Sequence, residues 1–113
     1  MANWESAVLA AKDAAEQGDW EACGLLLKDG HIQVCVNHAD SPGRFAMSPS
    51  AANAAYEHWR MDNLEAIWHS HPNGDPNPSL EDWMGHPIGP KMIIIALHED
   101  SHTIHEYTED DRP

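Results

Sequence analysis

One uninterrupted apolar run, Met92 to Leu97, limits the folds open to this chain more than any other feature. The run is far too short to cross a bilayer, and its lack of alternation is typical of a central strand. His102 to Tyr107 is predicted as its hairpin partner, across a turn at Glu99-Asp100. The chain is therefore expected to contain a β-sheet that other elements must cover.

The rest of the chain predicts more strands and several helices. Apolar residues at helical spacing, or a serine cap, predict helices at 3–17, 48–61 and 79–85. Strands are predicted at 21–28, 31–37 and 64–70. This order predicts a single α/β (α+β) domain in which helices flank a mixed sheet.

The first hairpin is predicted from Asp29-Gly30, a strong turn signal between two apolar runs. Centring the turn there pairs Cys23 with Val36 and Gly24 with Cys35. The two sulfurs then point to opposite faces of the sheet, so a disulfide is not expected.

Length and charge narrow the functional classes. The 113 residues fit one domain, predicted at 1–107 with a frayed acidic tail at 108–113. A net charge of −13 repels phosphate backbones, so no nucleic-acid partner is expected; the charge favours either basic partners or simple solubility. The N-terminus lacks the basic start and apolar run of a signal peptide, which predicts a soluble cytoplasmic protein with no membrane partner. The oligomeric state stays open.

The strongest chemical signal is a His-x-His pair at the end of a predicted strand. His69 and His71 are two residues apart, so both imidazoles face the same side. After a proline-rich loop, Asp82 follows on the first turn of a helix. Two histidines and one carboxylate make a three-ligand metal site that leaves a position open for water.

Each piece of this signal also has a simpler interpretation. A His-x-His pair arises easily by chance in a chain with nine histidines. Ser79 followed by Asp82 is also a helix cap signature, and a capped helix end is a stiff support for a ligand. Side chains alternate along a strand, and this alternation puts Glu21 on the face that is expected to be covered. A buried carboxylate is costly there unless its charge is compensated. The alternative is a solvated position at a frayed strand start. The joint spacing, not any single piece, carries the metal-site prediction.

That spacing resembles the full signature of the JAMM (MPN+) metallopeptidase family. Residues 69–72 read His-Ser-His-Pro, and Ser79 and Asp82 follow at the family's intervals. Residues 20–24, Trp-Glu-Ala-Cys-Gly, resemble its Glu-x-Cys-Gly context. The similarity extends from about Glu21 to Leu97. Residues 35–45 resemble the prokaryotic and phage branch, in which similar domains occur in tail-assembly proteins.

The resemblance implies a zinc metallopeptidase or isopeptidase that hydrolyses an amide bond. His69, His71 and Asp82 would hold Zn²⁺, and Glu21 would carry a proton from water to the leaving amine. Ser79 would help to stabilise the oxyanion. Ser70, between the histidines, would face away and make only a supporting hydrogen bond. The expected partner is a protein or peptide, such as a ubiquitin-like or tail protein, recognised by loops 38–48 and 84–91.

Two other functions compete with this one: a non-catalytic MPN-type scaffold or phage tail-assembly subunit, and a protein whose zinc is purely structural. A second metal site at His98, His102 and His105 is not expected, because His102 and His105 have opposite parity on a strand. Three tryptophans, Trp20, Trp59 and Trp68, are expected in the core. Trp83, directly after Asp82, fits either the core or a wall of the site.

Overall fold

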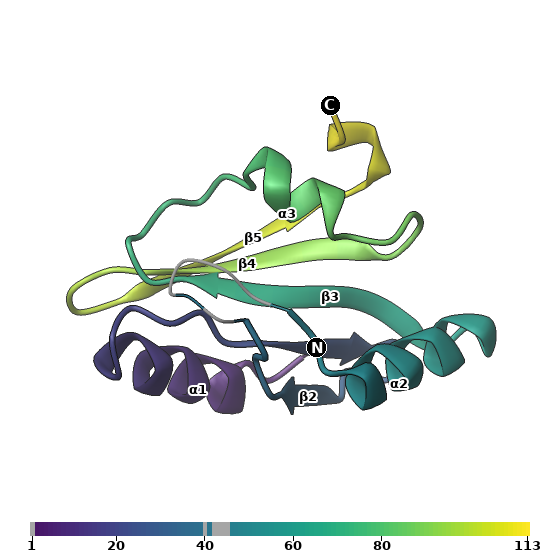
Figure 1. Cartoon of the computed structure of the whole chain (residues 1–113), viewed down its shortest axis with the longest axis horizontal. Helices are drawn as coiled ribbons and strands as arrows, with labels where there is room; N and C mark the ends of the chain where they lie inside the picture. The colour runs from purple at the N-terminus through teal and green to yellow at the C-terminus, as the bar shows by residue number, and fades with distance from the viewer. Residues whose placement is uncertain (1, 40, 42–45) are drawn as a thin grey trace.

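The computed structural model describes residues 2–39, 41 and 46–113, which form one five-stranded sheet with helices on both faces (Figure 1). The elements, in chain order, are α1 (Glu5–Glu16), β1 (Cys23–Leu27), β2 (Ile32–Cys35), α2 (Pro49–Arg60), β3 (Leu64–His71), α3 (Leu80–Met84), β4 (Lys91–Leu97), β5 (His102–Tyr107) and the 3₁₀ turn η1 (Glu109–Asp111).

The sheet is mixed, and its strand order is β2-β1-β3-β4-β5. Strands β3 and β4 run parallel, while the other neighbours are antiparallel. The predicted α+β class is confirmed, and β4 is an interior strand as its apolar run predicts. Helix α3 lies in the connection between β3 and β4. Its first turn lies close to the end of β3, where Asp82 of α3 approaches His71. No helix in the described part of the chain is long and apolar enough to span a membrane.

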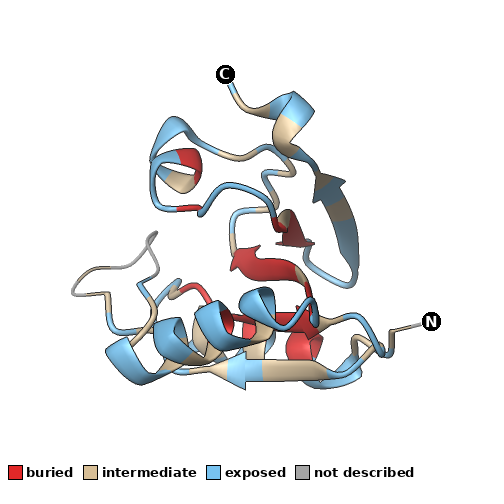
Figure 2. Ribbon diagram, turned by 90° about the vertical axis from the view of Figure 1, so that its right-hand side faces the viewer, coloured by how far each residue is buried: buried red, intermediate tan, exposed pale blue. Residues whose placement is uncertain are grey.

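Alternation along the strands gives the sheet two different faces. Trp68 and Ile93 are buried under α1, on one face. Leu25 and Ile67 are buried on the other face, beneath α2, while Trp83 of α3 packs on neighbouring β4 side chains there. Figure 2 shows the buried residues concentrated in the inner strands β1, β3 and β4, whereas the edge strands β2 and β5 and the outer sides of the helices are more exposed. Because β3 alternates in this way, its histidines point to the face shared by α2 and α3.

The hairpin register differs by one residue from the predicted one. Cys23 lies opposite Cys35 rather than Val36. The reason is that Gly30 adopts a φ of 91°, so the turn is a three-residue loop, Lys28 to Gly30, rather than a two-residue turn. The two cysteines therefore share a face, contrary to the prediction, and both are free thiols.

Two other expectations about packing were wrong. Trp59 is 42% exposed, whereas Trp68 is fully buried as predicted and Trp20 is half-buried. The C-terminal segment is not frayed, because Arg112 donates hydrogen bonds to the carbonyls of Trp83 and His86 and its guanidinium lies over the Trp83 ring. The extended piece predicted around Phe45 lies outside the described residues.

Candidate metal centre

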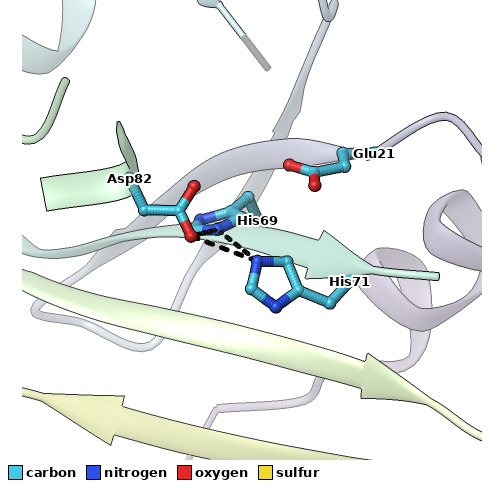
Figure 3. A group of neighbouring side chains, drawn as sticks. All are labelled: Glu21, His69, His71 and Asp82. Atoms are coloured by element: carbon cyan, nitrogen blue, oxygen red, sulfur yellow. Dashed lines mark hydrogen bonds and ion pairs between the residues drawn. The ribbon is translucent and has the colours of Figure 1, made fainter. Parts of the chain in front are cut away.

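The end of β3 presents two imidazoles to the same side of the sheet (Figure 3). His69 and His71 are both buried, and their Nε2 atoms lie 3.2 Å apart. This follows from the two-residue period of a strand, which was the basis of the sequence prediction. The two ring nitrogens converge on one point in space.

Helix α3 brings a carboxylate to that point. Asp82 Oδ2 lies 3.3 Å from His69 Nε2 and 3.2 Å from His71 Nε2. The same oxygen accepts a hydrogen bond from the backbone N–H of Ser79, and Ser79 Oγ accepts one from the backbone N–H of Asp82. The predicted helix cap is therefore confirmed, and the capping carboxylate is also the one that reaches the histidines.

Two opposing effects set the pKa of Asp82. Burial by itself raises its pKa, but the hydrogen bonds with His69 and His71 outweigh burial and hold the pKa well below its usual range. The carboxylate is therefore ionised at neutral pH, as a metal ligand must be.

Glu21, just before β1, supplies a second carboxylate. Its side chain is only 4% exposed, and its Oε1 has no hydrogen-bond partner in the described part of the chain. Burial raises the pKa of Glu21 to about 7, with His71 opposing and Asp82 reinforcing the shift. The expected alternative of a solvated strand start is excluded by this burial.

Backbone contacts hold these groups in place. Ser70 Oγ accepts a hydrogen bond from the backbone N–H of Ala22 at 2.8 Å, which ties β3 to the segment that carries Glu21. This confirms the supporting role predicted for Ser70. His71 Nδ1 lies 2.7 Å from the carbonyl oxygen of Asp75. A carbonyl only accepts, so Nδ1 carries the hydrogen and Nε2 of the neutral ring presents a lone pair to the site.

The four side chains fit a small divalent cation. One ligand atom from each of Glu21, His69, His71 and Asp82 lies within 4.8 Å of all the others. Zinc bonds of about 2.0–2.1 Å at tetrahedral angles place ligand atoms about 3.3 Å apart, which matches the separations among the two Nε2 atoms and Asp82 Oδ2. The Oε1 of Glu21 adds a buried acceptor beside this group.

Ser79 and Trp83 occupy different surroundings. Ser79 is exposed and lines, together with Asp82, two cavities that meet at the site. Trp83 lines neither cavity; it packs with Met92 and Ile94 in the core, which decides between its two expected positions.

Sequence reasoning missed several residues around the site. Tyr56 and Trp59 of α2 line the larger cavity, and Asp19 and Asp75 line the smaller one. The spacing of Tyr56 and Trp59 places them on one helix face, which is a usable signal for a shared surface. The predicted recognition loops also line the larger cavity, through Ala46, Met47, Gly85, His86, Pro87 and Pro90.

The fold and the site together define a small α+β domain whose mixed sheet carries a buried group of two histidines and two carboxylates. A family profile described as prokaryotic homologs of the JAB domain (Prok-JAB) matches residues 5–108. The chain belongs to this family.

Solved structures show the same fold. The chain is similar to the solution structure of protein DSY2949 from Desulfitobacterium hafniense, with a TM-score of 0.70 and 23% identity over 94% of this chain and 80% of that one. It is also similar to the solution structure of a protein from Salinibacter ruber, with a TM-score of 0.51 and 14% identity over 90% of this chain and 76% of that one. No curated protein matches the chain.

Proposed function

We propose that this protein is a JAMM-type zinc metallopeptidase or isopeptidase that hydrolyses an amide bond in a protein or peptide. The observation that carries the proposal is the convergence of His69, His71 and Asp82 on one point, beside the buried Oε1 of Glu21, which has no hydrogen-bond partner among the described residues. A cap or a chance His-x-His pair alone would not require a second, desolvated carboxylate there.

Two of the three proposed ligands, His71 and Asp82, are held in position by backbone groups before a cation binds. The Nδ1–H of His71 donates to the carbonyl of Asp75, which fixes the ring orientation and leaves Nε2 available. The Ser79 backbone N–H holds Asp82 Oδ2 in place. A bound zinc ion supplies Lewis acidity and lowers the pKa of a coordinated water from about 15.7 to about 7.

Glu21 is suited to moving a proton between water and the leaving group. Burial raises its pKa to about 7, so the carboxylate can both accept and return a proton near neutral pH. Glu21 takes a proton from water, whose oxygen bonds to the carbonyl carbon. The C–N bond then breaks, and Glu21 returns the proton to the departing amine.

Ser79 is proposed as an oxyanion donor. Its Oγ already accepts the N–H of Asp82, which fixes the position of the hydroxyl and leaves its own hydrogen for another acceptor. Removing one such donor typically lowers kcat by about 10²–10³.

The test combines metal content with hydrolysis. Purified wild-type protein is analysed for bound zinc and incubated with a mixed peptide library, whose cleavage is followed by mass spectrometry. We expect near-stoichiometric zinc in the wild type, its loss in His71→Ala, and its retention in Glu21→Gln, with no cleavage by either variant. His102→Ala and Glu16→Gln, at exposed positions away from the site, are matched controls that keep both zinc and cleavage.

Two results would contradict the proposal. Wild-type protein without zinc after growth in zinc-supplemented medium would favour the non-catalytic scaffold. Stoichiometric zinc with no cleavage, and with Glu21→Gln behaving as wild type in every assay, would favour a structural zinc.

A further inference from the structure

Two cavities, one mainly apolar and one acidic, border the candidate metal centre. A groove of about 520 Å³ lies between α2 and the segment that follows α3. A second cavity of about 370 Å³, called here the acidic cleft, is lined by Asp19, Glu21 and Asp75 among others. Ser79 and Asp82 line both cavities, so a chain that passes over the site would place one end in each.

The groove is mainly apolar, although Glu81, Asp82 and His86 also line it on the side of α3. Ile67 and Leu64 of β3 line it. Ile67 precedes His69 by two residues, so both side chains face the same side of the sheet. Tyr56, 63% exposed, and Trp59, 42% exposed, add aromatic surface from α2. Large exposed aromatic side chains beside an apolar floor are typical of a site that takes a bulky apolar group.

The acidic cleft has the opposite character. No lysine or arginine lines it in the described part of the chain. A divalent cation would offset the charges of Asp82 and Glu21, whereas Asp19 and Asp75 would remain as two exposed carboxylates. The net charge of −13 reinforces this local field. The cleft therefore favours a cationic group.

Glu21 gives the substrate a direction. It lines the acidic cleft and not the groove. In the reaction proposed above, Glu21 returns the proton to the departing amine, so the amine must leave from the cleft side. The acyl part of the substrate then lies in the apolar groove.

We infer that the preferred substrate is a peptide with a bulky apolar side chain on the acyl side of the scissile bond and a basic side chain on the amine side. This inference rests on the proposed function for the direction of the chain, while the pairing of an apolar with a cationic subsite rests on the two cavities alone. The step is the hydrolysis already described, with no further reactant.

The test uses four capped peptides that differ only at the two residues flanking one bond: Phe-Lys, Phe-Glu, Gly-Lys and Gly-Glu. Their kcat/KM values are measured with wild-type protein, and their Kd values with Glu21→Gln protein as purified, by fluorescence anisotropy. We expect kcat/KM to be at least about tenfold higher for Phe-Lys than for Gly-Lys, because burying an aromatic side chain is strongly favoured. We expect it to be about tenfold higher for Phe-Lys than for Phe-Glu. The Kd values should show the same ranking.

Variants separate the two subsites. Tyr56→Ser is expected to cut the Phe-over-Gly ratio by about threefold and to leave the Lys-over-Glu ratio unchanged. The double variant Asp19→Asn/Asp75→Asn is expected to bring the Lys-over-Glu ratio close to one. Asparagine at position 75 keeps a side-chain oxygen that can accept the Asn77 N–H. Leu9→Ser and Asp100→Asn, both exposed and remote from the cavities, are the matched controls.

Binding and hydrolysis distinguish the failure of this inference from the failure of the proposed function. Equal Kd and kcat/KM values for all four peptides, a preference for Gly-Glu, or no binding to any peptide would overturn the inference, even if the enzyme proved active. The expected ranking in Kd without any hydrolysis would support the two subsites and contradict the proposed peptidase activity.

Discussion

Replacing Glu21 with glutamine should stabilise the metal-free protein while removing the proposed hydrolytic activity. The carboxylate is 4% exposed, and its burial raises its pKa from 4.5 to about 7. The folded state therefore binds more protons than the unfolded state between these two values, so stability falls as pH rises through that window. Below about pH 4.5 the acid is protonated in both states and the penalty vanishes.

The magnitude follows from the same shift. Each pKa unit corresponds to about 1.4 kcal/mol, so the ionised carboxylate costs the metal-free folded state about 3 kcal/mol at pH 8. Glutamine keeps the shape and removes the charge. For a domain of this size, the variant should melt about 10–15 °C higher at pH 8.

Thermal unfolding in a chelating buffer measures this directly, by circular dichroism at pH 8 and pH 4.5. Glu16→Gln on the outer surface of α1 is the control, and exposed substitutions usually change stability by less than about 0.5 kcal/mol. Equal melting temperatures for wild type and Glu21→Gln at pH 8, or the same difference at both pH values, would refute the reasoning.

Three further predictions concern the metal, the sheet and the support of the site. The proposed zinc should raise the Tm of the wild-type protein and a chelator should lower it again, since free metal at 100 times its Kd stabilises the folded state by about 2.7 kcal/mol; calorimetry with and without chelator checks this. Gly24→Ala should prevent folding, because its Cβ would lie 2.0 Å from a backbone oxygen of β2 and 2.6 Å from the Trp68 ring, and a soluble variant with a native spectrum would contradict it. Ser70→Ala leaves the buried N–H of Ala22 unpaired and should cost about 1–3 kcal/mol in urea unfolding, and it should reduce the proposed hydrolysis more than the proposed zinc binding.

The candidate site was predictable because its geometry is local. The strand period places His69 and His71 on one face, and the cap geometry places Asp82 at the start of α3. Both rules act over two or three residues. Only the resemblance to a known signature indicated that the strand end and the helix start, separated by the loop, form one site. Strand parity placed Glu21 on the covered face but left a solvated strand start open, and the structure decides for burial.

Features that depend on long-range packing were not predictable in the same way. The hairpin register depended on whether Gly30 closed a two-residue or a three-residue loop, and both fit the same letters. Trp59 looked like a core residue, but α2 packs on the sheet through Ala55 and leaves the indole at the groove. The two cavities arise from the spacing of separate elements, for which no local pattern exists.

The double use of Asp82 Oδ2 links the order of a short helix to the state of the cation. A five-residue helix has little stability of its own, and this oxygen is both its cap and an anchor to β3. Loading the ion would hold that oxygen from a second direction, so the first turn of α3 could open only by giving up a coordination bond. The backbone amides of Asp82 and Trp83 should then exchange hydrogen for deuterium more slowly as the cation fills the site. Their exchange rates would therefore report how much of the protein holds the ion.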